Sequence, residues 1–163
     1  MAEELTIETV QKALNGDAPL NSIFGLSTDQ IGAIASLGYN LYEQARMAEA
    51  TQIFTGLTSL DNTNYLGFAG LGAVALAQEP PDLDSAVAFL KKAAELNSSD
   101  PSIFANLGEA YLRQAKFEDA AAAFDKALEL DPDEEDPGAN RARAIIDGME
   151  IVIGELQRME KEV

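Results

Sequence analysis

The sequence of 163 residues contains no cysteine, no histidine and no tryptophan. Without cysteine the chain can form neither a disulfide framework nor a thiolate metal site, and it has no thiol nucleophile. Without histidine it also lacks the usual general base and the commonest transition-metal ligand. Catalysis would have to rest on carboxylates alone. We therefore expect that the protein is not an enzyme and that it has no catalytic residues, no metal site and no cofactor.

Basic residues and long apolar runs are also scarce. Lys and Arg number 11 against 28 Asp and Glu, so the formal net charge is -17. Such a surface repels phosphate backbones and anionic lipid, and we expect no nucleic-acid partner. No stretch approaches the roughly 20 apolar residues of a membrane helix, which predicts no stable membrane insertion. Residues 1–4 are acidic where a signal peptide would be basic, which indicates a cytoplasmic location.

The densest group of carboxylates lies at residues 131–136. A calcium loop is the functional hypothesis for such a run, but the glycine at the sixth position and the spaced oxygen ligands of that loop are missing. Bare acidic runs are common in exposed connections. The pattern therefore favours a solvated turn between helices.

A repeat runs through the middle of the chain. Leu37-Gly38, Leu71-Gly72 and Leu107-Gly108 place their glycines 34 and then 36 residues apart. After each pair comes an alanine, followed four residues later by Phe or Leu: Ala50 and Phe54, Ala86 and Leu90, Ala120 and Phe124. Small residues let two antiparallel helices approach closely, and large ones fill the gaps between successive pairs. This pattern resembles the tetratricopeptide repeat, most fully in residues 101–134.

The repeat predicts an all-α fold, a tandem tetratricopeptide-repeat helical solenoid with an N-terminal helix and a C-terminal capping helix. We expect three repeats within residues 31–134, at 31–64, 65–100 and 101–134. Helix starts are indicated by Ser27 with Gln30, by Asp82, and by Asp100-Pro101 and Asp136-Pro137. Repeat two is two residues longer than the others, and Glu79-Pro80-Pro81-Asp82 places the insertion in the turn between its helices.

Both flanks are predicted to be helical. In residues 1–30, Leu5, Val10 and Leu14 have loose helical spacing and are candidate dimerisation residues; this segment could instead cap its own stack or fold over the groove. In residues 135–163, apolar residues recur every three or four positions. They are Ile145, Ile146, Met149, Val152, Ile153, Leu156 and Met159. Because the last repeat has no neighbour, we expect this helix to cap it.

One stripe of each first helix should line the concave surface of the stack, because the opposite positions are used in packing. The candidate peptide-binding residues on it are Ala35, Tyr39, Tyr42, Leu66, Ala69, Ala73, Leu76, Ala105, Glu109 and Leu112. None is Lys or Arg, so the stripe offers no cation to a peptide carboxylate. It suits an extended peptide that inserts apolar anchors. The alternative is that the stripe packs on the chain's own flanking helices.

Residues 34–42, Ile-Ala-Ser-Leu-Gly-Tyr-Asn-Leu-Tyr, resemble the first repeat of the class II type III secretion chaperones, which serve translocator proteins. Residues 66–73 resemble their second. The resemblance implies a homodimeric cytosolic chaperone whose concave groove holds an extended segment of a hydrophobic translocator and keeps it soluble before secretion. It also implies that Tyr39 and Tyr42 are groove aromatics. A general scaffold or adaptor remains the alternative, because repeat three is close to the general tetratricopeptide pattern.

Overall fold

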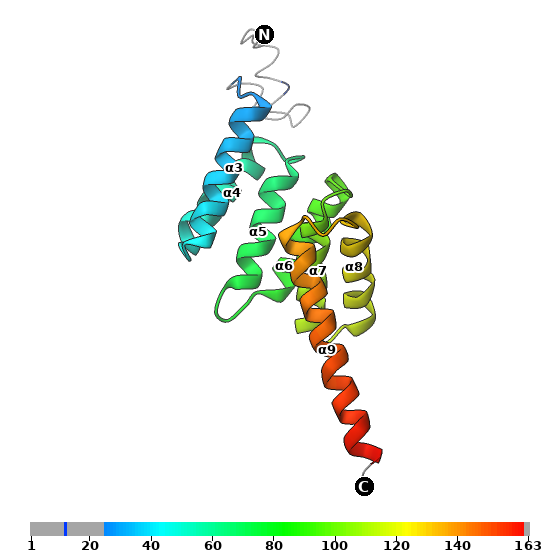
Figure 1. The fold of residues 1–163 in the computed structure, drawn as a ribbon. Coiled ribbons are helices and arrows are strands. Elements are labelled where there is room, and N and C mark those ends of the chain that lie inside the picture. Colours follow the sequence, from blue (N-terminus) through cyan, green and yellow to red (C-terminus); the bar gives the residue numbers. More distant parts are fainter. Residues whose placement is uncertain (1–11, 13–24, 162–163) are drawn as a thin grey trace. The chain divides into compact units, whose positions relative to one another are not determined.

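The computed structural model describes residue 12 and residues 25–161, and over that part of the chain every regular element is a helix (Figure 1). The helices form three antiparallel pairs followed by one long helix, which confirms the all-α repeat prediction. The bounds are α3 (Thr28–Glu43), α4 (Met47–Leu60), α5 (Tyr65–Ala77), α6 (Leu83–Leu96), α7 (Pro101–Arg113), α8 (Phe117–Leu130) and α9 (Pro137–Lys161). The candidate dimerisation residues Leu5, Val10 and Leu14 lie outside the described residues.

The chain divides into two compact units, Met1–Ser98 and Ser99–Val163. The first contains the pairs α3–α4 and α5–α6, and the second contains the pair α7–α8 together with α9. The division falls next to the predicted boundary between repeats two and three.

Side-chain caps begin the helices where the sequence indicates. The Ser27 hydroxyl accepts the Gln30 backbone N–H at 3.2 Å, and the Gln30 side chain accepts the Ser27 N–H at 2.8 Å, so both halves of the capping box are present. Asp82 and Asp100 likewise accept backbone N–H groups at the starts of α6 and α7. These caps satisfy amide groups that the first helical turn leaves unpaired.

The turns inside the pairs differ in length as predicted. Residues 44–46 join α3 to α4 and residues 114–116 join α7 to α8, whereas residues 78–82 join α5 to α6. The two extra residues of repeat two therefore lie in the turn between α5 and α6. The two short turns share one conformation, because Ala45 and Ala115 both have φ of 58°.

Replacing Ala115 by glycine should stabilise the second unit by about 0.5–1 kcal/mol, because the left-handed conformation strains a residue with a Cβ atom more than it strains glycine. Ala122, exposed in the middle of α8, is the matched control. There the same change should cost about 0.5–1 kcal/mol of helix stability. Urea unfolding followed by circular dichroism measures both. If both variants changed the free energy of unfolding in the same direction, the explanation by a strained turn would be contradicted.

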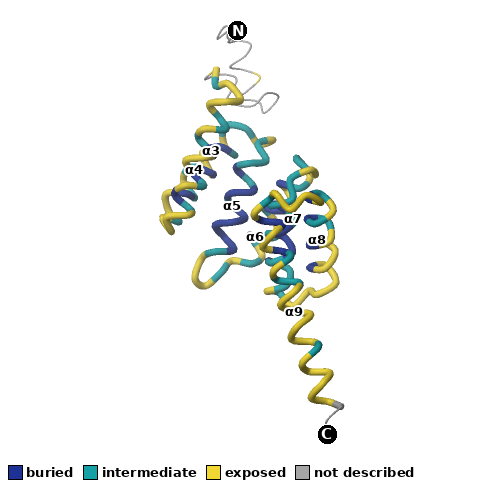
Figure 2. The backbone as a smooth tube through the Cα atoms, viewed as in Figure 1, coloured by how far each residue is buried: buried dark blue, intermediate teal, exposed yellow. Residues whose placement is uncertain are grey.

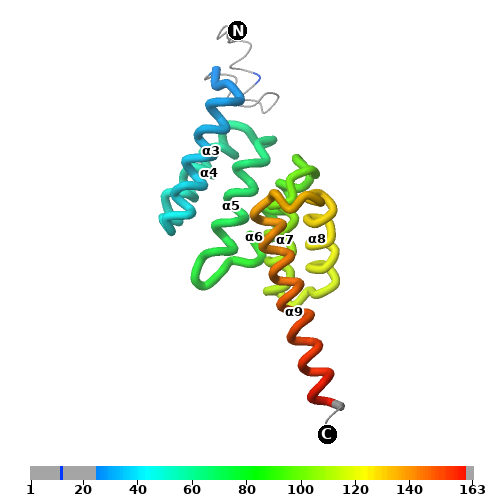
Figure 3. The backbone as a smooth tube through the Cα atoms, in the orientation of Figure 1, coloured from blue at the N-terminus to red at the C-terminus, as the bar shows by residue number. Residues whose placement is uncertain are grey.

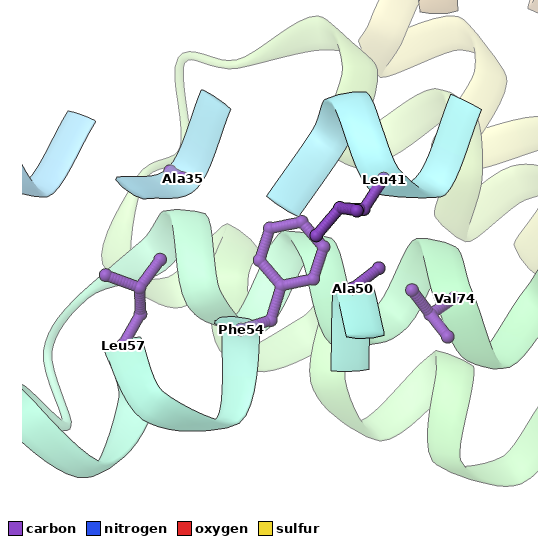
Figure 4. Close-up of a cluster of buried hydrophobic side chains, with 6 residues drawn as sticks. All are labelled: Ala35, Leu41, Ala50, Phe54, Leu57 and Val74. Carbon is purple, nitrogen blue, oxygen red and sulfur yellow. The ribbon is translucent and has the colours of Figure 1, made fainter. Parts of the chain in front are cut away.

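The core of the first unit is built around Phe54 of α4, which is completely buried. Figure 4 shows its ring pointing from α4 toward α3, among Ala35, Leu41, Ala50, Leu57 and Val74. The ring fits because glycines face it from both neighbouring helices. A Cβ atom at Gly38 of α3 would lie 2.7 Å from a ring carbon, and one at Gly70 of α5 would lie 2.3 Å away. The three helices are thus held at a spacing that only glycine permits.

The second unit repeats this arrangement around Phe124 of α8. A Cβ atom at Gly108 of α7 would lie 2.5 Å from the Phe124 ring. Ala105, Ala120 and Ala127 complete the cluster, and α9 adds Ala142 from the other side. The first part of α9 therefore caps the third helix pair, as expected.

Only the first part of α9 covers the third helix pair. Ala139 and Ala142 are buried, and Ile145 and Ile146 pack on the Phe124 cluster. Beyond them α9 extends past the ends of α7 and α8 (Figure 3), and Figure 2 shows that this part is almost wholly exposed. The apolar periodicity of residues 149–159 thus belongs to a helix face that the described part of the chain does not cover.

Candidate peptide-binding face

In the first unit, the predicted stripe separates into buried and half-buried members. Ala35 of α3 is 2% exposed and belongs to the Phe54 core. Ala69, Ala73 and Leu76 are buried in α5, which is apolar along its whole length. The half-buried members are Tyr39 and Tyr42 of α3 and Leu66 of α5. We call these three residues the tyrosine face.

The tyrosine face rests directly on the core. The Tyr39 ring meets the Phe54 ring edge to face, with centroids 5.0 Å apart and an interplanar angle of 65°. Tyr42 and Leu66 pack against the same cluster of buried residues. Edge-to-face aromatic contacts favour one ring orientation. The tyrosine face therefore consists of partly exposed apolar side chains that rest on a packed core.

In the second unit, the stripe lies against α9. Ala105 is buried in the cluster that includes Ala142, and Leu112 is half-buried beside Ile146. The Glu109 carboxylate lies 3.5 Å from the Arg141 guanidinium of α9 and 3.7 Å from that of Arg113. Here the stripe packs on a flanking helix, which is the alternative that the sequence left open.

Arg141 is a cation beside this stripe that the sequence analysis missed. Its guanidinium donates a hydrogen bond to the Asn106 side chain and pairs with Glu109. The sequence does contain a signal that could have identified Arg141. Asp136-Pro137 repeats Asp100-Pro101, so α9 can be aligned with α7, the first helix of repeat three. Arg141 then occupies the position of Ala105, within the stripe. Its charge is balanced by Glu109, and both side chains contribute to the contact between α7 and α9.

The acidic turn at 131–136 was expected to be solvated, and residues 132–135 are exposed, but Asp131 is buried. Asp131 is 7% exposed and accepts the backbone N–H groups of Glu135 and Asp136 at 3.0 and 3.1 Å. Its other oxygen accepts from Arg143 at 2.9 Å. The hydrogen bond from Arg143 holds the pKa of Asp131 below its usual value. This carboxylate ties the turn to α9, which gives it a structural role.

A second carboxylate of this unit is shifted in the opposite direction. Burial raises the pKa of Asp100, the cap of α7, and nearby Asp136 acts in the same sense. Asp136 itself accepts from the Ser102 hydroxyl at 2.9 Å and caps α9 through the Ala139 N–H at 2.8 Å. Among the described residues, no three carboxylates are placed to hold a metal ion. Nor is any helix there long and apolar enough to cross a membrane.

Comparison with known proteins agrees with this geometry. Residues 101–134 match the family model of the tetratricopeptide repeat, and no curated protein matches the sequence. A type III secretion complex from Aeromonas hydrophila contains a similar chain, with 23% identity, a TM-score of 0.70, and coverage of 90% of this chain and 98% of that one.

Two further solved structures are similar over most of their length. The type III secretion translocator chaperone SycD of Yersinia enterocolitica has 21% identity and a TM-score of 0.65, covering 80% of this chain and 98% of SycD. PcrH, solved in complex with the chaperone-binding region of PopB, has 26% identity and a TM-score of 0.62, covering 74% of this chain and 97% of PcrH. The chain thus has the tetratricopeptide-repeat fold and, as residues 34–42 led us to expect, its structure resembles the translocator chaperones of type III secretion.

Proposed function

We propose that this chain is a cytoplasmic chaperone of a type III secretion system, without enzymatic activity. It binds an extended segment of a hydrophobic translocator protein and keeps that protein soluble before secretion. The observation that carries the proposal is the tyrosine face, a half-buried apolar surface in the repeats that resemble the chaperones. The similarity to PcrH, which was solved with a chaperone-binding region, supports it.

The tyrosine face suits an extended apolar segment for two physical reasons. Side chains of an extended peptide can pack against Tyr42 and against Leu66, while the Tyr42 hydroxyl reaches the polar peptide backbone. The Phe54 floor already holds Tyr39 in place, so little side-chain entropy is lost on binding. Ala35, buried beneath the face, brings the helices close enough to form that floor.

The acidic surface complements this binding. A net charge of -17 keeps a complex with an apolar client from self-association and disfavours contact with anionic membranes. A chaperone of membrane-active clients needs both properties. The remaining stripe residues, Ala69, Ala73 and Leu76, are proposed as walls of the groove, and dimerisation through Leu5, Val10 and Leu14 remains a prediction.

A general adaptor for folded proteins is the second candidate. It is favoured by the third repeat, whose stripe is occupied by α9 and by the Glu109–Arg141 ion pair and leaves little apolar surface for an extended peptide. In a pull-down, an adaptor would capture folded multi-subunit partners. In the same experiment, a chaperone would capture a single translocator that is insoluble when expressed without it.

The proposed function is tested by co-expression with a hydrophobic translocator protein of a type III secretion system. Truncating both Tyr42 and Leu66 to alanine should weaken the complex at least tenfold, because each side chain contributes on the order of 1–2 kcal/mol of apolar contact. The yield of soluble translocator and the dissociation constant of the purified complex measure the effect.

Leu37→Ala is the matched control, since Leu37 is a large apolar residue of the same helix but is 50% exposed and lies outside the tyrosine face. It should leave binding unchanged. Circular dichroism confirms that all variants are folded. Normal binding by the Tyr42 and Leu66 double variant would refute the tyrosine face as the client site.

A further inference from the structure

The exposed half of α9 carries an apolar stripe that continues the face with which this helix packs on α7 and α8. Ile145 and Ile146 pack on the Phe124 cluster. From there, steps of three and four residues lead to five side chains that are between 39% and 63% exposed. We call them the α9 stripe: Met149, Val152, Ile153, Leu156 and Met159. Ile151, two residues before Ile153, lies on the opposite side of the helix.

An apolar cavity of about 230 Å³ lies where the α9 stripe begins. Leu112 and Phe124 line it from the helix pair, and Met149 and Ile153 line it from α9. Phe117, 61% exposed at the start of α8, belongs to the same lining. A cavity of about 150 Å³ can hold a benzene ring, so this one admits a large apolar side chain. Because Met149 and Ile153 belong to both features, the cavity and the α9 stripe form one continuous apolar surface.

The pattern of the α9 stripe fits a helix as its partner. Beyond α7 and α8 (Figure 3), so short a helical segment is only marginally stable when nothing packs on it. Gly148 and Gly154 lower its helix propensity further, and a Cβ atom at either position would meet nothing within 4 Å, so close packing does not explain these glycines. Apolar residues at steps of three and four let two helices pack lengthwise. A helix along the stripe would both cover it and stabilise it.

The charged groups around this apolar surface are mainly acidic. Asp125 and Glu150 belong to the lining of the cavity, and no lysine or arginine does among the described residues. Residues 147–161 contain four acidic and two basic residues. One of the two, Arg158, lies 2.9 Å from Glu155 and is paired with it. Charge complementarity therefore favours a partner that carries positive charge beside its apolar residues.

The same charges disfavour other parts of this chain as the occupant. Residues 1–17 contain four acidic residues and one lysine. A second copy would bring another acidic α9 against this one, and like-charged surfaces repel each other. Anionic lipid is disfavoured for the same reason. The occupant that fits best is a basic segment of a different protein.

We propose that the α9 stripe and its cavity bind an amphipathic helix of another protein, one that carries lysine or arginine beside its apolar residues. The bound helix lies along the α9 stripe, and one of its large apolar side chains enters the cavity beside Phe117. Its basic residues pair with Asp125 and Glu150. This site lies in the second unit and shares no residue with the tyrosine face. The proposal therefore does not depend on the proposed function and can be tested without a translocator.

A synthetic amphipathic peptide of leucine and lysine is the test ligand, with leucines at steps of three and four over about four helical turns. Calorimetric titration of the full chain should show one peptide bound per chain, and a peptide with glutamate in place of lysine should not bind. Hydrogen exchange of the amides in residues 149–160 should slow in the complex, because the bound helix stabilises this half of α9. Unchanged exchange at these amides would overturn the proposal.

Ile153→Ala should weaken binding of the leucine–lysine peptide about tenfold, because it removes part of the cavity wall. Ile151→Ala makes the same change on the opposite side of α9 and should leave binding unchanged. Both side chains are more than half exposed, so neither variant threatens folding. Equal losses of affinity in the two variants would refute the α9 stripe as the binding surface.

Two double variants that change the net charge equally test the role of the carboxylates. Asp125→Asn with Glu150→Gln should weaken binding of the peptide about fivefold. Asp119→Asn with Asp147→Asn should have little effect, because neither residue lines the cavity. If both double variants weakened binding equally, the peptide would be attracted by the acidic chain as a whole, which would overturn the proposed site.

Other occupants of this surface would give different results. A change of oligomeric state caused by Ile153→Ala in sedimentation equilibrium would assign the surface to a second copy. Tighter peptide binding after Leu5→Ser with Leu14→Ser would assign it to the chain's own N-terminal segment, because a competitor would have been removed. Weaker peptide binding after Tyr42→Ala with Leu66→Ala would place the peptide at the tyrosine face. Each of these results would overturn the proposal.

Discussion

Replacing Phe54 by alanine is expected to lower the free energy of unfolding of the first unit by about 3–5 kcal/mol, the usual cost of removing a fully buried aromatic ring. The cost should be at the upper end because Gly38 and Gly70 leave no side chain that could fill the cavity. Urea unfolding of the full chain gives the total change. Hydrogen exchange of the α3–α5 amides assigns it to the first unit.

Phe117→Ala is the control for this change. It removes the same ring from a site that is 61% exposed, so its effect on stability should be about 1 kcal/mol or less. A loss at Phe54 no larger than the loss at Phe117 would contradict the central packing role of the Phe54 ring.

Replacing Gly108 by alanine should cost about 1–3 kcal/mol, although alanine is the better helix former. The added methyl group would lie 2.5 and 2.6 Å from two carbons of the buried Phe124 ring, closer than carbon atoms approach without displacement. Overpacking therefore outweighs helix propensity. Thermal and urea unfolding show directly whether Gly108→Ala lowers or raises the free energy of unfolding.

Gly56 offers the same substitution without the clash, since nothing would lie within 4 Å of a Cβ atom there. Gly56→Ala should stabilise α4 by about 0.5–1 kcal/mol. If Gly108→Ala were also stabilising, the close approach of α7 and α8 would not depend on glycine as described.

Much of the fold could be predicted from the sequence because the repeat pattern encodes helix packing directly. Gly38 and Gly108 mark the positions that face Phe54 and Phe124, and the structure brings each pair together. Helix starts were equally predictable, because Ser27 and Asp100 are local caps that depend on a few neighbouring residues. Such local chemistry needs no knowledge of the tertiary structure.

The peptide-binding stripe was less predictable. Helical spacing assigned Tyr39 and Ala35 to the same face, but it does not distinguish a residue on the surface from one beneath it. Alanine is short, so Ala35 lies in the core, whereas the longer Tyr39 reaches the surface from the same stripe. The depth of each position depends on the neighbouring helix.

The role of α9 was predicted only in part for a similar reason. Apolar periodicity is the same whether a helix face packs on its own unit, as at Ile145, or extends beyond it, as at Leu156. The length of α9 relative to α7 and α8 decides which residues are covered, and no local pattern contains that information. Arg141 was missed because the stripe was traced only along the three repeats.

Crosslinking from the tyrosine face tests the proposed function most directly. A photoreactive phenylalanine analogue at position 42, in the full chain mixed with an extended apolar peptide of a type III secretion translocator, should form a covalent adduct. The same analogue at position 37, on another side of α3, should form none. Adducts from position 37 and not from position 42 would contradict binding at the tyrosine face.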